Sequence, residues 1–189
     1  MDIHHPADVR YTRIAVILHW LIAALIIFNL SLGLIMEGLH GPVRGFWIPL
    51  HMSIGMTVLI LTLARICWRL THRPPALFDG PQWEHLAAHL AHFTIYALML
   101  GLPVTGWAII SAHPPGGPGA PHYFGLFKIP ALPVLPFLNS AVQKQAHDTA
   151  VSAHTVAGYL MIGLLVLHVL AALKHQFIDR HPQFRRMSL

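Results

Sequence analysis

The sequence predicts an all-α membrane protein in which four transmembrane helices form a bundle, with a long outer loop between the third and fourth helices. Composition is the first reason, because 55% of the 189 residues are hydrophobic and 10% are charged. A soluble domain carries about 25% charged residues. The second reason is a pattern: four runs contain no Asp, Glu, Lys or Arg and are long enough to cross a hydrocarbon core of about 30 Å. Most of the exterior should therefore contact lipid.

The four runs are continuous apolar blocks rich in Leu, Ile and Ala, which favours helices over the alternating strands of a membrane barrel. The second run, 48–64, is short for a span, but arginine side chains just beyond it can reach back to the interface. We therefore extend it through Arg65 to the neighbourhood of Arg69. Within one domain that covers residues 1–189, the predicted helices are 14–36, 48–70, 86–112 and 149–176.

The segments between the runs differ in composition. Residues 37–47 contain three glycines and a proline and are expected to form the first outer loop. In residues 113–148, positions 114–119 are all Pro or Gly, and many large apolar side chains follow. A segment with so many apolar side chains is not expected to be a flexible linker surrounded by water. We expect it to fold as a cap on the outer face of the bundle.

Cations lie at the ends of the apolar runs and indicate the orientation. If the N-terminus is inside, the outer segments carry only Arg44, Lys128 and Lys144. The inner segments then carry Arg10, Arg13, Arg65, Arg69, Arg73, Lys174, Arg180, Arg185 and Arg186. Both termini are therefore predicted to be cytoplasmic. Because the cations flank spans rather than interleave with polar sequence, the net charge of +5 predicts no nucleic-acid binding.

The sequence has 16 histidines and a single cysteine, Cys67. One cysteine excludes an intramolecular disulfide, a thiolate zinc site, an iron–sulfur cluster and a haem attached through paired cysteines. Any bound metal must therefore be held by nitrogen or oxygen.

An imidazole within an apolar run is costly unless it has a partner, and four histidines of the runs stand out: His19, His51, His154 and His168. His154 and His168 are separated by a rise of about 21 Å and share roughly one face of the fourth helix. Given the predicted topology, His51 matches the outer depth of His154, and His19 matches the inner depth of His168. The sequence therefore predicts an outer pair and an inner pair of imidazoles.

Two facing imidazoles are what a six-coordinate haem iron requires, together with room for the macrocycle. A small residue lies four positions after each of the four histidines: Ala23, Gly55, Gly158 and Ala172. Each of these could instead serve ordinary helix packing. The joint pattern predicts two non-covalent b-type haems, with the axial ligand pairs His51/His154 and His19/His168.

Several short motifs along the chain form one pattern: Tyr11, Thr12, Arg13, His19, Trp20, His51, Gly55, Arg65, Arg69, Ala88, His89, Leu90, Ala91, His92, Leu102, Pro103, Val104, Thr105, Gly106, His154, Gly158, Tyr159, Gly163, His168 and His175. With these residues the chain resembles the bacterial cytochrome b561 family over nearly its whole length. That resemblance implies a four-helix dihaem protein of the bacterial inner membrane, and the same four haem ligands. The enterobacterial member is a superoxide oxidase that passes electrons to ubiquinone, which implies superoxide as donor and ubiquinone as acceptor. The outer segment here is richer in Pro and Gly than the family pattern.

Further candidates lie toward the predicted inner face. His85, His89 and His92 share one helical face and could form a metal site, border a quinone pocket or be wetted at the interface. His175 could hydrogen-bond a haem propionate or a quinone carbonyl, or simply complement the helix dipole. The candidate cations for propionates are equally explained as membrane anchors: Arg13, Arg65, Arg69 and Lys174.

The functional hypothesis is an oxidoreductase that passes electrons from superoxide at the outer haem, through the inner haem, to a quinone near the inner face. One alternative is a cytochrome b anchor subunit that links a dehydrogenase or hydrogenase partner to quinone. Another is a histidine-lined transporter for a divalent metal. No run contains Asp or Glu, and transport sites usually recruit carboxylates, which argues against the transporter.

Overall fold

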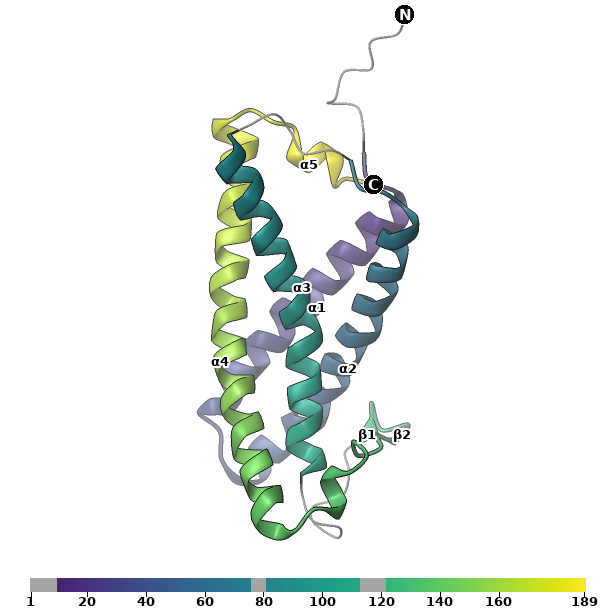
Figure 1. The fold of residues 1–189 in the computed structure, drawn as a ribbon, viewed down its shortest axis with the longest axis vertical. Coiled ribbons are helices and arrows are strands. Elements are labelled where there is room, and N and C mark those ends of the chain that lie inside the picture. The colour runs from purple at the N-terminus through teal and green to yellow at the C-terminus, as the bar shows by residue number, and fades with distance from the viewer. Residues whose placement is uncertain (1–9, 76–80, 113–121) are drawn as a thin grey trace, which may run out of the picture.

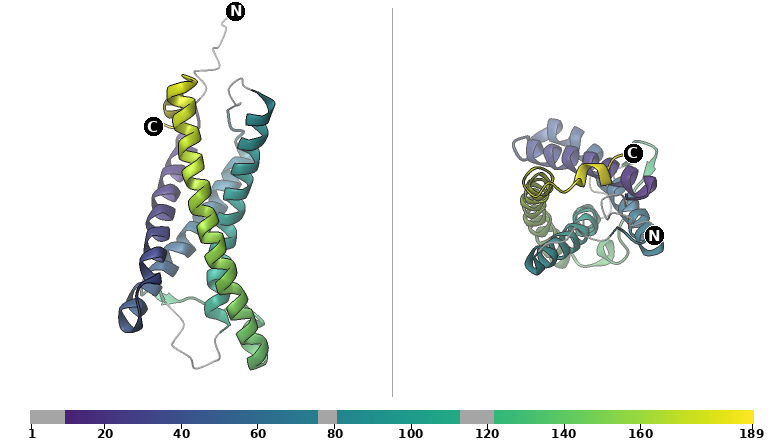
Figure 2. Two further views of the ribbon diagram at one scale, coloured as in Figure 1. Left: turned by 90° about the vertical axis from the view of Figure 1, so that its left-hand side faces the viewer. Right: turned by 90° about the horizontal axis from the view of Figure 1, so that it is seen from above.

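The computed structural model describes residues 10–75, 81–112 and 122–189. Four long helices run up and down through the molecule (Figure 1): α1 (Arg13–Glu37), α2 (Gly41–Thr71), α3 (Gln82–Ser111) and α4 (Ser140–Leu173). Each packs against the next in chain order, and seen from above they surround a common centre (Figure 2). All four are long and apolar enough to cross a membrane. The predicted four-helix membrane fold is confirmed.

The first two helices are joined by a very short connection. Thr12 caps α1 by accepting a hydrogen bond from the main-chain N–H of Ala15. Helix α2 begins at Gly41, so most of the predicted loop 37–47 is helical, and the predicted start at 48 is too late. Pro42 explains the difference, because a proline in the first helical turn lacks only an N–H that the turn does not use. Gly41 has a φ of +59°, which favours glycine.

Helix α4 begins at Ser140, well before the predicted 149. The Asn139 side chain caps it by accepting a hydrogen bond from the N–H of Val142. Hydropathy marks only the part of a helix that crosses lipid, so the polar first turns were missed. At its other end α4 passes into a π-helical turn, η3 (Lys174–Ile178), which is followed by the short helix α5 (Gln183–Arg186).

The described part of the outer segment packs against the bundle as expected. It contains a two-stranded hairpin, β1 (His122–Tyr123) with β2 (Phe127–Lys128), and a 3₁₀ turn, η2 (Leu135–Phe137). Ser53 of α2 accepts a hydrogen bond from the main-chain N–H of Phe124, and the hydroxyls of Thr57 and Tyr123 lie 3.0 Å apart. The Pro- and Gly-rich stretch 113–121 lies outside the described residues.

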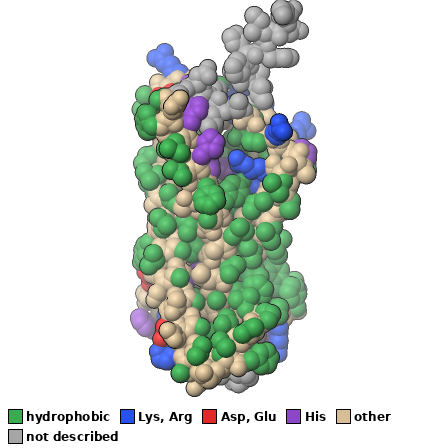
Figure 3. All heavy atoms as spheres, viewed as in Figure 1, with side chains coloured by type: hydrophobic (Ala, Val, Ile, Leu, Met, Phe, Trp, Pro, Cys, Tyr) green, Lys and Arg blue, Asp and Glu red, His purple; other side chains and the backbone are tan. Residues whose placement is uncertain are grey.

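Large apolar side chains cover the outside of the bundle (Figure 3), for example Ile27, Phe93 and Leu167. A buried apolar layer at mid-height consists of Ile22, Ile26, Ile54, Val58, Met99 and Met161. Apolar side chains on the exterior as well as in the core fit a molecule whose solvent is lipid.

The start of α1 and the end of the chain lie at the same end of the bundle, opposite the hairpin (Figure 1). Two hydrogen bonds tie them together: Tyr11 N–H to the Arg186 carbonyl, and the Trp20 indole N–H to the Met187 carbonyl. We call this end the inner end of the bundle, and the end with the hairpin the outer end. Placement of the inner end in the cytoplasm stays a prediction from the flanking cations.

Candidate functional site

Near the outer end of the bundle, the side chains of His51 on α2 and His154 on α4 face each other. Their ring centroids are 6.0 Å apart and their planes are inclined by 76°. A glycine on each of the other two helices flanks the pair. A Cβ atom on Gly33 of α1 would lie 3.5 Å from the His51 Cε1, and one on Gly106 of α3 would lie 3.3 Å from the His154 Cε1. The two glycines therefore let both imidazoles pack closely against neighbouring helices.

The surroundings of His154 determine its protonation pattern. Its Nδ1 lies 3.0 Å from the main-chain carbonyl of Leu102 and 3.0 Å from the Thr105 hydroxyl. Because the carbonyl can only accept, Nδ1 carries the proton and donates it, and Nε2 keeps the lone pair that binds a metal. A hydrogen bond of this kind is the usual support of a metal-ligating histidine.

His51 differs from His154 in its surroundings. Its Nδ1 is buried and has no hydrogen-bond partner among the described residues. Buried polar atoms without a partner are rare in native structures, and they often mark a place where a bound group completes the surroundings.

Three imidazoles gather toward the inner end of the bundle. His19 of α1 lies 6.3 Å from His168 of α4 between ring centroids, with an interplanar angle of 64°. His92 of α3 lies 5.7 Å from the same His168 ring. The predicted partner of His168, His19, is thus present. Beside the pair lies His92, one of the three histidines for which the sequence left a metal site, a quinone pocket and the interface as alternatives.

Arg65 of α2 completes this inner group. Its Nε donates a hydrogen bond of 2.9 Å to the Tyr96 hydroxyl, and its Nη1 donates one of 3.1 Å to the Ala15 carbonyl. The side chain thus bridges α1, α2 and α3 at the depth of the inner imidazoles. A guanidinium at this position supplies a fixed positive charge beside any group bound there.

The site residues repeat every seven positions along each helix, which is two turns and a rise of about 10.5 Å on nearly one face. One residue of each helix belongs to the outer layer, one to the buried apolar layer and one to the inner layer. From the outer to the inner layer the residues are Gly33, Ile26 and His19 on α1; His51, Val58 and Arg65 on α2; Gly106, Met99 and His92 on α3; and His154, Met161 and His168 on α4.

Three of the other predicted site residues are not part of the inner layer. The Nδ1 of His89 donates a hydrogen bond of 2.6 Å to the His85 carbonyl of its own helix. The Arg69 guanidinium lies 5.8 Å from the centre of the Tyr96 ring, a cation–π contact. Arg13 is exposed at the start of α1. His89 is exposed as well, although His89 and Arg69 are both near enough to interact electrostatically with His92.

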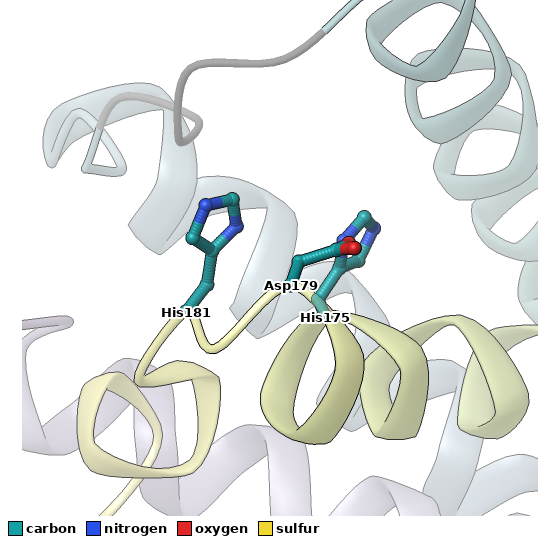
Figure 4. A group of neighbouring side chains, drawn as sticks. All are labelled: His175, Asp179 and His181. Carbon is teal, nitrogen blue, oxygen red and sulfur yellow. The ribbon is translucent and has the colours of Figure 1, made fainter.

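Lys174 and His175 belong to a polar cluster at the inner end of α4. The Lys174 ammonium donates hydrogen bonds to Glu84 of α3 at 3.0 Å and to Asp179 at 2.8 Å. The Nδ1 of His175 lies 2.7 Å from the same Asp179 carboxylate. Lys174 first, and then His175, hold the pKa of Asp179 below its usual value. The ring of His181 lies beside the cluster, as Figure 4 shows.

A sequence model of the prokaryotic cytochrome b561 family matches residues 10–188. The chain belongs to this family. A cytochrome b561 homolog 2 of Escherichia coli K12 is 31% identical over 183 residues, which cover 94% of this chain and 90% of that protein. A probable superoxide oxidase of Yersinia pestis is 27% identical, with 94% of this chain and 95% of that protein covered. A cytochrome b562 of Cereibacter sphaeroides is 28% identical, with 94% of each chain covered.

Membership of the cytochrome b561 family implies b-type haem, and the residues of this cytochrome b561 fit that group. A bond between a metal and an imidazole nitrogen is about 2.0–2.1 Å, so two imidazoles on opposite sides of one metal have ring centroids on the order of 6 Å apart. Both pairs have this separation. A Cβ added at Gly158, one turn beyond His154, would meet no atom within 4 Å. There is therefore open space beside the outer pair.

The small neighbours expected from the sequence are only part of the surroundings of the outer pair in this cytochrome b561. A Cβ on Gly55 would lie 3.7 Å from the Asn29 side chain, so Gly55 serves the contact between α1 and α2. The glycines that touch the imidazoles, Gly33 and Gly106, were missed. The signal that could have found them is the seven-residue spacing, since Gly33 lies fourteen residues after His19 and Gly106 fourteen after His92.

Proposed function

We propose that this cytochrome b561 holds two b-type haems, one between His51 and His154 and one between His19 and His168, and that it transfers electrons across the membrane between them. The observation that carries the proposal is the pair of facing imidazoles at each of two depths. The Nδ1 hydrogen bond of His154 to the Leu102 carbonyl supports ligation through Nε2. Bound haem would supply one-electron redox chemistry, which no side chain of the site has.

The chain's own residues set the separation of the two sites. His154 and His168 lie on one helix with a rise of about 21 Å between them. The apolar layer that contains Met161, 1% exposed, fills the space between. This layer excludes water and ions from the middle of the bundle, which favours an electron path over an ion path.

The overall reaction that we propose is the oxidation of superoxide at the outer side and the reduction of a quinone, such as ubiquinone, at the inner side. Two superoxide anions each give up one electron and become O₂, and one quinone takes two electrons and two protons to become a quinol. The similarity to a probable superoxide oxidase supports the choice of donor. Arg44, Lys128 and Lys144 are exposed at the outer end, where positive potential would attract an anion.

For the quinone we propose contacts near the inner end of α4. Lys174 and His175 are half-buried there. The Lys174 ammonium has a third N–H beside the two that Glu84 and Asp179 accept, and this donor suits a quinone carbonyl. Arg65 is the best candidate among the predicted cations for a haem propionate, because it lies beside the inner imidazoles and two of its hydrogen bonds hold it in position.

The ligand assignment is tested by single replacements in the purified protein. We expect His51→Ala and His154→Ala each to halve the haem content per chain, because each removes one ligand of the outer site and leaves the inner site intact. The measurement is the haem-to-protein ratio from the reduced pyridine adduct. His147→Ala, which lies on α4 but outside both layers, is the control. Unchanged haem content in both ligand variants would refute the assignment.

The donor and acceptor are tested by rapid mixing. Superoxide generated in excess should reduce the haems, and a soluble ubiquinone analogue should reoxidise them in a protein purified without partners. If the isolated chain is inert to superoxide but is reduced when a quinol or a partner dehydrogenase is supplied, it acts instead as a cytochrome b anchor subunit.

A further inference from the structure

The chain reverses direction immediately after α4. In the π turn the N–H of Asp179 donates to the Lys174 carbonyl at 3.1 Å, and the N–H of His181 donates to the His175 carbonyl at 2.8 Å. Arg180 between them has a φ of +57°, in the left-handed region. A non-glycine residue in that region is uncommon and is maintained by its surroundings. This turn carries His181 back over the last turn of α4.

As a result, the side chains of His175, Asp179 and His181 lie close together, with the Asp179 carboxylate against the His175 ring (Figure 4). One ligand atom from each residue lies within 4.8 Å of the others. The two imidazole rings are nearly parallel, inclined by 18°, with centroids 6.2 Å apart. All three side chains are half-buried. They are therefore shielded on one side and open to solutes on the other.

We propose that His175, Asp179 and His181 form a binding site for a divalent transition-metal ion, with Zn²⁺ as the best fit. Two imidazole nitrogens and one carboxylate oxygen are a common ligand set of zinc sites that leave a fourth position to water. Bonds to these ligands are about 2.0–2.2 Å, so the ligand atoms need to move inward only slightly. Ca²⁺ and Mg²⁺ are disfavoured because they require mainly oxygen ligands.

The charges around the site decide how binding proceeds. Lys174 is the competing cation, because its ammonium already contacts the Asp179 carboxylate at 2.8 Å. Glu84 of α3 lies 3.0 Å from the same ammonium and can hold it when the metal takes Asp179. A bound metal therefore replaces the contacts of Asp179 with Lys174 and His175, and it preserves the pair of Lys174 with Glu84. Arg180 is exposed and, being next to Asp179 in sequence, adds positive potential that limits affinity.

The metal site is independent of the four proposed haem ligands. His175 lies seven residues, or about 10.5 Å of helix, beyond His168. Zinc binding can therefore be present whether or not the proposed electron transfer is correct. Zinc and quinone would compete for His175, because an imidazole nitrogen that is bound to zinc cannot also bind a quinone.

The experiment measures zinc binding by the haem-loaded protein, purified in detergent through a tag without histidine and stripped with a chelator. Calorimetric titration with ZnCl₂ and metal analysis after equilibrium dialysis should give one zinc per chain. His175→Gln, Asp179→Asn and His181→Gln should each weaken this binding about tenfold or more, as loss of a ligand or its support does in metal sites. The visible haem spectrum verifies that each variant is folded.

Matched controls separate this site from the many other histidines. His147→Gln alters a histidine–aspartate contact at the outer end of α4, and His4→Gln/His5→Gln removes an adjacent pair near the N-terminus. Both should leave the affinity unchanged. Lys174→Met should strengthen zinc binding, because the competing ammonium is gone.

Equal affinity of the native protein and the Asp179→Asn and His181→Gln variants would overturn the proposal. So would binding that weakens in Lys174→Met, or zinc that disappears only with His4 and His5.

Discussion

At the scale of single residues, the outer site depends on two positions that have no side chain. Gly106 allows the His154 ring to approach α3, and Gly33 allows the His51 ring to approach α1. The space for an added side-chain carbon differs between the two positions. An added Cβ at Gly106 would lie 3.3 Å from His154 Cε1 and 3.6 Å from its Nδ1, whereas one at Gly33 would have an ordinary contact of 3.5 Å. Only the first would compel the imidazole to shift.

This difference predicts a graded response to added methyl groups. Gly106→Ala should displace the His154 ring and weaken its hydrogen bond to Leu102, so the outer haem should be lost more readily and its midpoint potential should shift. Gly33→Ala should retain haem as the native protein does. Redox titration followed by visible spectroscopy gives both quantities.

Gly163→Ala on α4 is the control, because a Cβ there would meet nothing within 4 Å. If Gly106→Ala behaves like Gly163→Ala, the close packing of His154 against α3 is not important for the site.

At the scale of secondary-structure elements, the outer hairpin is attached to α2 through two hydroxyls, those of Ser53 and Thr57. Ser53 is 1% exposed. Its Oγ accepts the N–H of Phe124 at 2.9 Å and donates to the Pro49 carbonyl at 2.7 Å. Pro49 is two turns into α2, so this one side chain joins the hairpin to the helix that carries His51. The hairpin therefore stabilises the outer layer as well as covering it.

We expect Ser53→Ala to destabilise the protein by about 0.5–1.5 kcal/mol, because the Phe124 N–H would lose its partly buried acceptor. The loss is measured as a lower midpoint of thermal unfolding in detergent. Ser31→Ala is the matched control: its hydroxyl also bonds a carbonyl one turn back, that of Ile27, but it reaches no other element. Equal destabilisation by the two changes would contradict the role given to Ser53.

Sequence reasoning succeeded for the middles of the helices and failed at their ends. The run 14–36 agrees closely with α1, whereas α2 and α4 begin earlier than hydropathy indicates. Lipid selects apolar residues only over the thickness of its hydrocarbon core. Capping by Asn139 and the proline in the first turn of α2 extend the helices beyond that limit, and neither changes the hydropathy.

At the scale of the whole molecule, the two layers of site residues are unequal. The outer layer contains two imidazoles and two glycines, and the inner layer contains three imidazoles and Arg65. A fixed positive charge favours the reduced state of a nearby redox group and also attracts anionic groups such as propionates. In the electron path that we propose, Arg65 would therefore favour transfer from the outer site to the inner site.

That orientation is tested with two single cysteines. In a Cys67→Ser background, Lys144→Cys lies at the exposed start of α4 and Ser188→Cys lies near the C-terminus. A membrane-impermeant maleimide added to intact spheroplasts should label Lys144→Cys alone, because the positive-inside asymmetry assigns the C-terminus to the cytoplasm. Lysis should then expose Ser188→Cys. The reverse labelling would require the opposite topology and the opposite direction of electron flow.

The sequence by itself determined the lipid environment, the four spans and the two depths of histidine. It could do so because a backbone in lipid must satisfy its own hydrogen bonds over long apolar runs, and an imidazole there needs a partner. Only the tertiary structure decided which neighbours complete the layers, namely Gly33, Gly106 and His92. It also decided that His181 returns to His175 and Asp179. That contact depends on a π turn and a left-handed Arg180, and backbone geometry of this kind leaves no periodic pattern of side chains to read.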